Sequence, residues 1–274
     1  MNMNMTRTAL TCLGWLASGL LTPCAMAQTQ TTDLPNAMLG WRGIELYSSQ
    51  NHLSNGYGNW RETGVRGIYE TGQHQIAGEV ASMNRFNQSG NYVGVGDTMV
   101  LDPDWYASLS VGGGDGVAYL PRYRADAFLH RKFLPNKNLV TSLGLGHYKS
   151  PDGHQDDNIS LGGTLYFEAP WIVQAEVRHT HSRPGNVGTE QYFVAATWGR
   201  HKQTLVTGRY GWGEEGYQSL GGLGSIARFS SHQSTLTVQH WIGTNWGIKA
   251  SAENYQNPYY RREGFLLAVF RDLP

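Results

Sequence analysis

The clearest pattern in the chain is a strict alternation of apolar and polar side chains in two neighbouring stretches, residues 157–168 and 171–182. In the second stretch Val173, Ala175 and Val177 occupy every other position, with polar side chains between them. A period of two indicates extended strands, because successive side chains of a strand point to opposite faces of the sheet. Only a two-residue turn separates the stretches, so they are predicted to form an antiparallel hairpin.

The length of these strands is typical of a membrane protein. Each stretch holds 12 residues, whereas strands of globular proteins average about 5–6 residues and a tilted strand crosses a bilayer with about 9–11. Similar stretches recur and predict about fourteen strands, with twelve or sixteen left open because residues 213–242 can be read as one strand or two. The predicted strands are residues 41–50, 60–70, 75–86, 91–100, 105–112, 121–133, 139–149, 157–168, 171–182, 189–199, 203–212, 225–242, 246–256 and 261–270. The predicted fold is therefore all-β, a transmembrane antiparallel up-and-down β-barrel.

The composition changes this picture little. The 274 residues include 35 glycines and 12 % aromatic residues, which suits a curved sheet with an apolar, aromatic outer face and a polar inner face. No mature stretch approaches the roughly 20 apolar residues of a transmembrane helix. The 21 basic and 21 acidic side chains balance, so charge does not suggest a nucleic-acid partner. The predicted location is the bacterial outer membrane.

The N-terminus has the features of a secretory signal peptide. Arg7 supplies the positive charge, residues 9–21 the apolar core, and an A-x-A cleavage site ends at Ala27. Both cysteines, Cys12 and Cys24, lie within this segment. Processing as a lipoprotein through Cys24 is the weaker alternative, because proline replaces the small residue expected before a lipidated cysteine. The predicted division is a signal peptide at 1–27, a periplasmic lead-in at 28–40 and the barrel at 41–274.

The connections between the predicted strands fall into short turns and longer loops. Outer-membrane barrels have short turns in the periplasm and longer loops outside, and residues 213–224 are among the predicted longer loops. Tryptophans near the short turns and tyrosines near the loops are predicted to form two interfacial girdles. The first girdle comprises Trp105, Trp171, Trp198, Trp241 and Trp246. The second comprises Tyr57, Tyr119, Tyr148, Tyr210, Tyr217, Tyr255 and Tyr259.

Four segments carry a resemblance to a known family. They are WYASLSV at 105–111, YLPRYRAD at 119–126, TLVTGRY at 204–210 and YYRREG at 259–264. From about Asp104 onward the chain resembles the YaiO family of outer-membrane β-barrel proteins. The resemblance implies a bacterial outer-membrane barrel, of a kind often found in proteins linked with surface polysaccharides, and it supplies no catalytic residues. The last strand, with its near-terminal Phe270, also resembles the signal recognised by the barrel-assembly machinery.

Charged residues on the polar face of the strands are the first candidates for function. Alternation predicts that these side chains point into the lumen: Glu62, Arg66, Glu79, Arg122, Arg124, Asp126, Glu176, Arg178, Arg209, Lys249 and Glu253. Pairing between opposite charges would stabilise the interior. Alternatively, Arg122, Arg124 and Arg178 offer hydrogen-bond donors to sugar hydroxyls or anions in a narrow polar passage.

A pair of histidines suggests the competing class, an outer-membrane lipid hydrolase similar to a lipid A deacylase. His179 and His181 share the predicted lipid-facing side of one strand, where they could also bind a metal ion or contact phosphates. Ser182 points the opposite way, and no acidic residue is expected at a matching strand offset beside the two histidines. The glycine-rich residues 112–116 lack the following helix of a phosphate-binding loop and are predicted to form a flexible loop.

The predicted function is therefore a non-enzymatic barrel, either a narrow pore or a scaffold that assists the export of an envelope polysaccharide. No catalytic residue, cofactor or metal site is predicted. The expected partners are outer-membrane lipid and lipopolysaccharide, the barrel-assembly machinery during biogenesis, and a polysaccharide.

Overall fold

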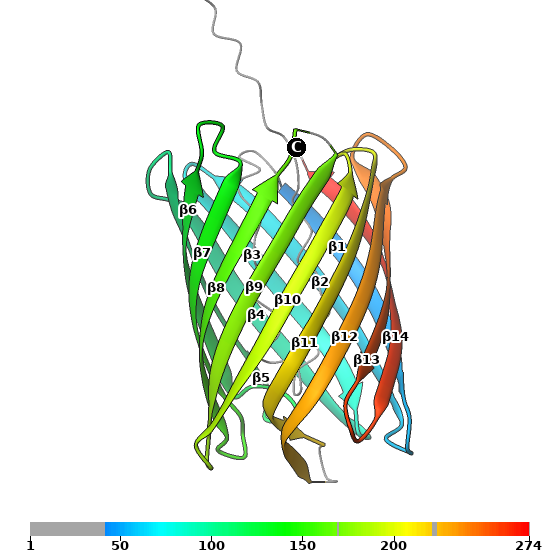
Figure 1. Ribbon diagram of the computed structural model, residues 1–274. Helices are drawn as coiled ribbons and strands as arrows, with labels where there is room; N and C mark the ends of the chain where they lie inside the picture. The colour runs from blue at the N-terminus through cyan, green and yellow to red at the C-terminus, as the bar shows by residue number, and fades with distance from the viewer. Residues whose placement is uncertain (1–41, 169, 221–223, 274) are drawn as a thin grey trace, which may run out of the picture.

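The computed structural model describes residues 42–168, 170–220 and 224–273, which form one closed barrel (Figure 1). Fourteen antiparallel strands each pair with their neighbours in sequence, and β1 closes the barrel against β14. This confirms the predicted up-and-down barrel and the predicted number of strands. Among the described residues no helix is long and apolar enough to span a membrane. The predicted signal peptide and lead-in lie outside the described residues.

The strands are long throughout the barrel, from 10 to 17 residues. Their bounds are β1 Arg42–Leu53, β2 Asn59–Thr71, β3 His74–Arg85, β4 Gln88–Val100, β5 Trp105–Gly114, β6 Tyr123–Phe133, β7 Leu139–Lys149, β8 Gln155–Tyr166, β9 Trp171–Arg183, β10 Val187–Gly199, β11 Thr204–Ser219, β12 Ser225–Trp241, β13 Trp246–Gln256 and β14 Arg261–Leu273.

Apolar and polar residues are separated onto the two faces of the wall. On β9, Val173 and Val177 are 42 % and 38 % exposed on the outside, and Ala175 between them is exposed too. The alternate residues Gln174 and Glu176 face inward and are partly buried. The same alternation runs round the barrel and leaves an apolar outer surface suited to contact with lipid, as in an outer-membrane barrel.

The two ends of the wall define its orientation. Arg42 pairs with Leu273, so both ends of the described barrel lie at one end, the upper end in Figure 1. The two-residue turn between β2 and β3 lies at this same end. Outer-membrane barrels place their short turns in the periplasm, and we call the opposite end the outer end. The predicted loop at residues 213–224 is different in the structure, because β11 continues to Ser219 and remains paired with β12.

Most, but not all, of the predicted tryptophan girdle faces lipid. Trp171, Trp198 and Trp246 are 42–48 % exposed on the outer face. The predicted position of Trp241 in this interfacial girdle is wrong. This side chain is 5 % exposed and points inward, where its Nε1–H donates to Asp272 Oδ2 at 3.1 Å. Proximity to a turn does not decide the face, whereas the register of β12 does.

The tyrosine girdle needs a larger correction. Tyr210 and Tyr259 are exposed, but Tyr148 and Tyr255 are buried on the inner face of their strands. Tyr119 is fully buried because the loop between β5 and β6 folds into the barrel. Some tyrosines of the predicted girdle thus lie at the lipid interface, and others lie in the interior.

Three apolar clusters line parts of the interior. One near the periplasmic end comprises Tyr106, Val140, Tyr166, Ile172, Leu205, Trp241 and Phe270. One against β3 and β4 comprises Tyr47, Ala81, Met83, Tyr92, Tyr119, Leu120, Leu266 and Ala268. One at the outer end comprises Leu53, Trp60, Leu220, Tyr255 and Tyr260. The charged side chains of the interior lie among these clusters.

Candidate functional site

The inner wall between β13 and β3 carries a connected network of buried charges. Arg66 lies between two carboxylates, 2.7 Å from Glu79 and 3.3 Å from Glu45. Glu45 also forms an ion pair with Lys249, which reaches it across β14. Glu45 and Lys249 are 0 % and 1 % exposed. Removing one member of such a pair leaves a buried charge uncompensated, which costs about 3–5 kcal/mol.

A tyrosine links this network toward the outer end. The Tyr47 hydroxyl lies 2.7 Å from Glu79 Oε1 and 2.8 Å from Glu62 Oε1. Arg85 completes the chain at 3.1 Å from Glu62. The Arg66 guanidinium also lies 4.0 Å from the centre of the Tyr47 ring. Side chains from three neighbouring strands are therefore held in one arrangement.

The outer end of the same wall combines arginines with aromatic rings. Arg262 pairs with Glu253 at 2.6 Å. The Trp60 ring lies 4.6 Å from the Arg85 guanidinium and 5.0 Å from that of Arg262. Tyr255 lies 4.7 Å from Arg262 on its other side. Cation–π contacts of this kind gain strength when water is excluded.

The opposite wall carries arginine–carboxylate pairs within single strands. Arg124 contacts Asp126 at 2.6 Å, two positions along β6. Arg178 contacts Glu176 at 2.6 Å in the same way on β9. Arg178 and Arg209 approach one ring, Phe193, at 5.4 Å and 4.7 Å. Planar donors and an aromatic face lie together here.

Hydroxyl groups and one imidazole continue this opposite wall toward the periplasm. Ser108 lies 2.9 Å from Thr98 and 3.4 Å from His130. His130 lies 2.7 Å from Ser142 and stacks on Tyr106 at 4.2 Å. The periplasmic part of this wall thus offers hydroxyls and an imidazole.

Ten of the eleven predicted lumen residues face the interior. They are Glu62, Arg66, Glu79, Arg124, Asp126, Glu176, Arg178, Arg209, Lys249 and Glu253. Arg122 does not. It is exposed and precedes β6, and its backbone N–H donates to the carbonyl of Lys149 at 2.7 Å. The strand was predicted to begin at residue 121 but begins at Tyr123, and alternation assigns a face only within a strand.

Several central residues were missed in the sequence. Glu45 and Tyr47 alternate with the exposed Leu46, so the pattern of β1 contained the signal for both. Arg85 and Arg262 are the last and second residues of β3 and β14. Alternation is weakest as a signal at strand ends, where the strand boundary itself is uncertain.

The arrangement of the outer-face histidines does not support a serine hydrolase site. Contrary to expectation, acidic residues do lie beside them, because the sheet pairs His179 with Glu190 and His181 with Asp157. The hydroxyl near this group belongs to Tyr192, and it donates to Glu190 Oε2 at 2.8 Å rather than to an imidazole. Ser182 points inward, as predicted.

Ser182 is committed to a different partner inside the barrel. Its hydroxyl donates to Asp156 Oδ1 at 2.5 Å, and His154 Nε2 lies 2.9 Å from that oxygen. The carboxylate thus stands between serine and imidazole, whereas nucleophilic activation requires the base next to the hydroxyl. The arrangement does not support the hydrolase alternative.

The glycine-rich segment is strand rather than loop. Residues 112–114 form the end of β5. A side chain at Gly112 would collide with the hydroxyl of Tyr92, and one at Gly114 would meet Leu120 at 2.5 Å. These glycines make room for the Tyr92 ring and the Leu120 side chain. No group of three or more His, Cys, Asp or Glu side chains that could hold a metal ion occurs among residues 42–273 as far as they are described.

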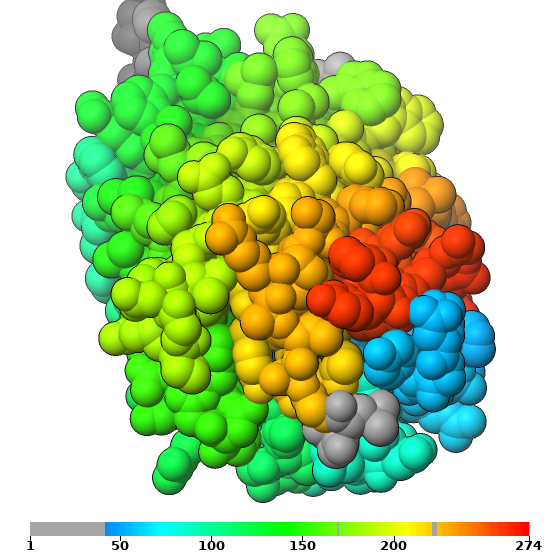
Figure 2. All heavy atoms as spheres, turned by 60° about the horizontal axis from the view of Figure 1, so that its bottom comes forward, coloured from blue at the N-terminus to red at the C-terminus, as the bar shows by residue number. Residues whose placement is uncertain are grey.

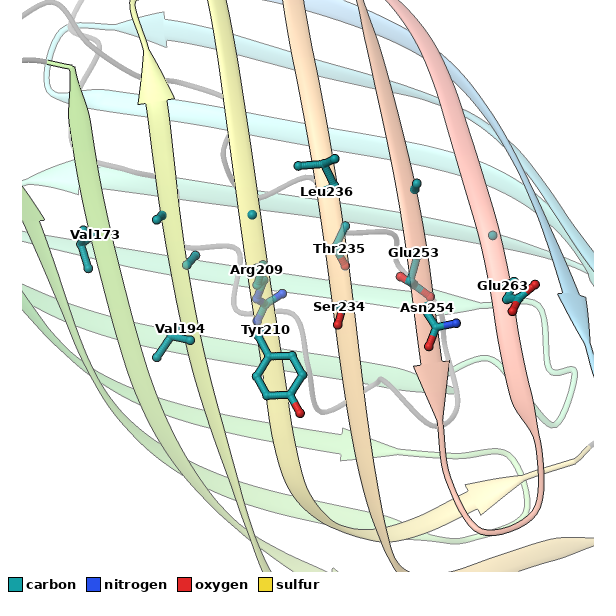
Figure 3. Close-up of a pocket in the computed structure, with 15 residues that line it drawn as sticks. Val173, Val194, Arg209, Tyr210, Ser234, Thr235, Leu236, Glu253, Asn254 and Glu263 are labelled. Atoms are coloured by element: carbon teal, nitrogen blue, oxygen red, sulfur yellow. The ribbon is translucent and has the colours of Figure 1, made fainter.

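A hollow of about 840 Å³ lies on the wall formed by β9 to β14 (Figure 3). Gly208 leaves space there between the exposed rings and chains of Val194, Tyr210 and Leu236. The hollow opens mainly toward lipid, so we place the candidate site on the inner wall instead.

One family matches the chain over most of the barrel. Residues 42–218 match the YaiO membrane beta barrel domain. No curated protein sequence shows significant similarity.

Solved structures show the same architecture at very low sequence identity. The TodX deltaS2S3 mutant, a monoaromatic hydrocarbon channel, is 7 % identical with a TM-score of 0.59, covering 85 % of this chain and 91 % of its own. An outer membrane channel from Pseudomonas putida F1 is 8 % identical with a TM-score of 0.56, covering 89 % and 99 %. A bacterial polysaccharide outer membrane secretin is 9 % identical with a TM-score of 0.52, covering 87 % and 100 %. At these identities the likeness concerns the fold alone.

Proposed function

The chain belongs to the family of YaiO membrane β-barrel domains and is a bacterial outer-membrane barrel, and from its inner wall we propose a non-enzymatic channel. The passage is narrow and takes polar solutes of the carbohydrate class, in support of moving an envelope polysaccharide.

The pairing of charges on the inner wall carries this proposal. Arg66, Arg85, Arg124 and Arg178 each lie within 3.3 Å of an inward-facing carboxylate. Opposed charges at this distance cancel each other's long-range field, so the wall selects neither anions nor cations strongly. A neutral, hydroxyl-rich solute fits such a wall.

The β4 to β10 side of the wall offers the groups that recognise sugars. Arg178 presents a planar set of donors and Phe193 an aromatic face, and they lie 5.4 Å apart. Ser108 and Thr98 add hydroxyls that both donate and accept hydrogen bonds. The neighbour described as a polysaccharide secretin shares this fold, but the proposal rests on the residues of the wall.

The outer surface suits the expected lipid partners. His179 is 52 % exposed on the lipid side of β9, toward the outer end. We place it at the level of lipopolysaccharide headgroups, with contact to their phosphates as its role.

Liposome swelling tests the passage. The purified barrel is reconstituted, and entry of neutral sugars is compared with entry of sugar acids and amino sugars of equal size. In a second, shortened protein, residues 214–230 are replaced by Asn-Gly. This two-residue turn joins Gly213 directly to its strand partner Ser231. We expect neutral sugars to enter faster than either charged set. If no sugar enters through either the complete or the shortened barrel, the protein is a sealed scaffold and the channel proposal is wrong.

A matched pair of substitutions tests the role of paired charges. Glu176→Gln removes a carboxylate beside Arg178 inside the barrel, whereas Glu190→Gln removes one from the outer face of the adjacent strand. We expect Glu176→Gln to shift selectivity several-fold toward sugar acids and Glu190→Gln to leave it unchanged. An equal change in selectivity for the two variants would show that the charges of the inner wall do not determine the selectivity.

A further inference from the structure

The last part of β11 leaves the barrel wall. Its pairing with β10 ends at Gly213, opposite Gln191, whereas its pairing with β12 continues to Ser219. Gly213 has a φ of +138°, and a side chain there would collide with the carbonyl oxygen of Glu190. Glycine is therefore needed where the strand turns away from its neighbour.

Beyond this point the strand runs across the inner side of the wall. Figure 3 shows β11 curving beyond Tyr210 toward the hairpin of β13 and β14. A Cβ on Gly216 would lie 3.8 Å from Thr189 Oγ1 and would collide with the hydroxyl of Ser182. Both side chains face inward from β10 and β9. The backbone of β11 thus covers the interior at the outer end.

Contacts hold this segment on one side to the loop before β8. The Tyr217 ring stacks on His154 with a centroid distance of 3.7 Å. Its hydroxyl donates to Asp152 Oδ2 at 2.5 Å. These two contacts form the latch of the segment.

Other contacts hold it on the far side of the mouth. Gln218 donates to the Tyr260 hydroxyl, and Glu215 accepts from Tyr255 at 2.8 Å. Leu220 packs in the outer-end cluster with Trp60. In Figure 2, which looks toward this end, the yellow and orange hairpin of β11 and β12 lies beside the red and blue strands. The segment spans the mouth from β8 to β14.

Polar atoms lie buried without partners behind this segment. Thr180 and Thr189 face each other across β9 and β10, and Gln191 is two residues further along. They are 1 %, 2 % and 4 % exposed, and Thr180 Oγ1, Thr189 Oγ1 and Gln191 Oε1 have no hydrogen-bond partner. Burying an unpaired polar group is unfavourable, so uncovering these three to water or to a hydroxylated solute favours a second, open arrangement.

We propose that Glu214–Ser219, with the paired residues Ser225–Ser230 of β12, is a hinged strap that closes the outer mouth and opens to expose Thr180, Thr189 and Gln191 as a subsite for a hydroxylated solute. The hinge is Gly213, and the latch is Tyr217 on His154 and Asp152. As a gate, the strap rests on the proposed channel function.

Cysteine labelling tests the strap directly. Cys12 and Cys24 are the only cysteines of the chain and are replaced by serine. Thr189→Cys is then introduced beneath the strap, and Asn186→Cys, in the exposed turn between β9 and β10, serves as the matched control. A water-soluble thiosulfonate reagent is applied to the reconstituted barrel with and without Tyr217→Ala.

We expect Asn186→Cys to react equally fast in both backgrounds. Thr189→Cys reacts slowly behind the intact strap and about tenfold faster with Tyr217→Ala, because a ring contact and a hydrogen bond together are worth about one decade in an equilibrium. Equal rates for Thr189→Cys and Asn186→Cys behind the intact strap would show that nothing covers the subsite.

The shortened barrel with Asn-Gly in place of residues 214–230 separates a gate from a fixed cover. If Thr189→Cys reacts quickly in that protein but remains slow with Tyr217→Ala, the strap is permanent and the proposal is overturned. Labelling needs no solute to cross the barrel. Its outcome is therefore independent of the swelling assay, and a strap that opens in a barrel that admits no sugar would count against the channel alone.

Discussion

Two segments fold inward at the outer end of the barrel, and they are held by different forces. The loop between β5 and β6 places Tyr119 and Leu120 at 0 % exposure in an apolar cluster with Met83 and Tyr92. The strap on β11 is held by the stack of Tyr217 on His154 and by hydrogen bonds. We call the first segment, residues 115–122, the plug.

The kind of contact that holds each segment determines which of them can move. Apolar burial contributes roughly 25 cal/mol per Å² and depends little on direction, so the plug is stabilised along its whole contact. The latch of the strap depends on a few directional contacts, each worth about 1 kcal/mol. The plug therefore belongs to the folded core, and the strap is the part that opens.

The largest effect is expected in the plug. Leu120→Asp places a charge in a fully buried apolar cluster and should destabilise the barrel by at least about 4 kcal/mol. Urea unfolding in lipid vesicles and heat-modifiable migration on gels measure this. An assembled barrel of normal stability would mean that the plug is not part of the core.

The next largest loss of stability is expected on the lipid-facing side of β9. Ala175→Arg puts a charge on the exposed outer face of β9 near mid-membrane and should cost about 2–4 kcal/mol. Gln174→Arg, one residue away, points into the interior and should be much milder. Assembled barrel in the outer membrane, measured by heat-modifiability, separates the two. Equal tolerance would contradict the register of β9.

A conservative change in the plug should have a moderate effect. The Tyr119 hydroxyl donates to the carbonyl oxygens of Met83 at 2.9 Å and Gln88 at 3.0 Å. Tyr119→Phe leaves these buried carbonyls without that donor, which should cost about 1–2 kcal/mol of unfolding free energy. Urea midpoints report the loss, while thiol labelling of Thr189→Cys should stay slow because the strap remains latched.

The matching change in the strap should hardly affect stability. Tyr217→Phe keeps the stack on His154 and removes only the hydrogen bond to Asp152. We expect the urea midpoint to change by less than that of Tyr119→Phe, and labelling of Thr189→Cys to accelerate a few-fold. A stability loss larger than that of Tyr119→Phe would reverse the assignment of fixed and movable segments.

The smallest expected effect is a response of the strap to acid. Burial alone would raise the pKa of Asp152, but hydrogen bonds from Ser150, Tyr217 and the backbone N–H of His154 lower it below its usual value. Because its pKa is lowered in the closed strap, the ionised Asp152 carboxylate stabilises the closed strap above the ordinary aspartate pKa of about 3.9. This stabilisation is lost as the pH falls through the lowered pKa. Because thiol reactivity itself falls with pH, the rate of Thr189→Cys is divided by that of the exposed Asn186→Cys at the same pH. This ratio should rise in that acidic window, less so with Tyr217→Phe, and a ratio that falls there would contradict the sign.

The sequence allowed the wall to be predicted but not the segments that fold into it. Alternation defined all fourteen strands and the inward face of residues such as Arg66 and Glu253, because a period of two repeats within every strand. It assigned Arg122 to the wrong side and gave no information on Tyr119, because both residues lie outside strands. Their positions depend on contacts between distant parts of the chain.

The extension of β11 was hidden for a related reason. Residues 213–224 are rich in glycine and polar residues, which is typical of a loop. In the structure Gly213 and Gly216 permit a bend and a close approach to Ser182 within a paired strand. A glycine in a loop and a glycine at a bend within a paired strand look alike in the sequence, and only the neighbouring strands distinguish them.

Single-channel recording in planar bilayers tests most directly whether the strap gates the barrel while the plug stays in place. The wild-type protein is compared with Tyr217→Ala at the same voltage and salt concentration. We predict that Tyr217→Ala increases the fraction of time spent open and leaves the conductance of the open state unchanged, because the latch is weakened while the wall and plug are intact. An unchanged open fraction, or a larger conductance with no closing events, would contradict a hinged strap.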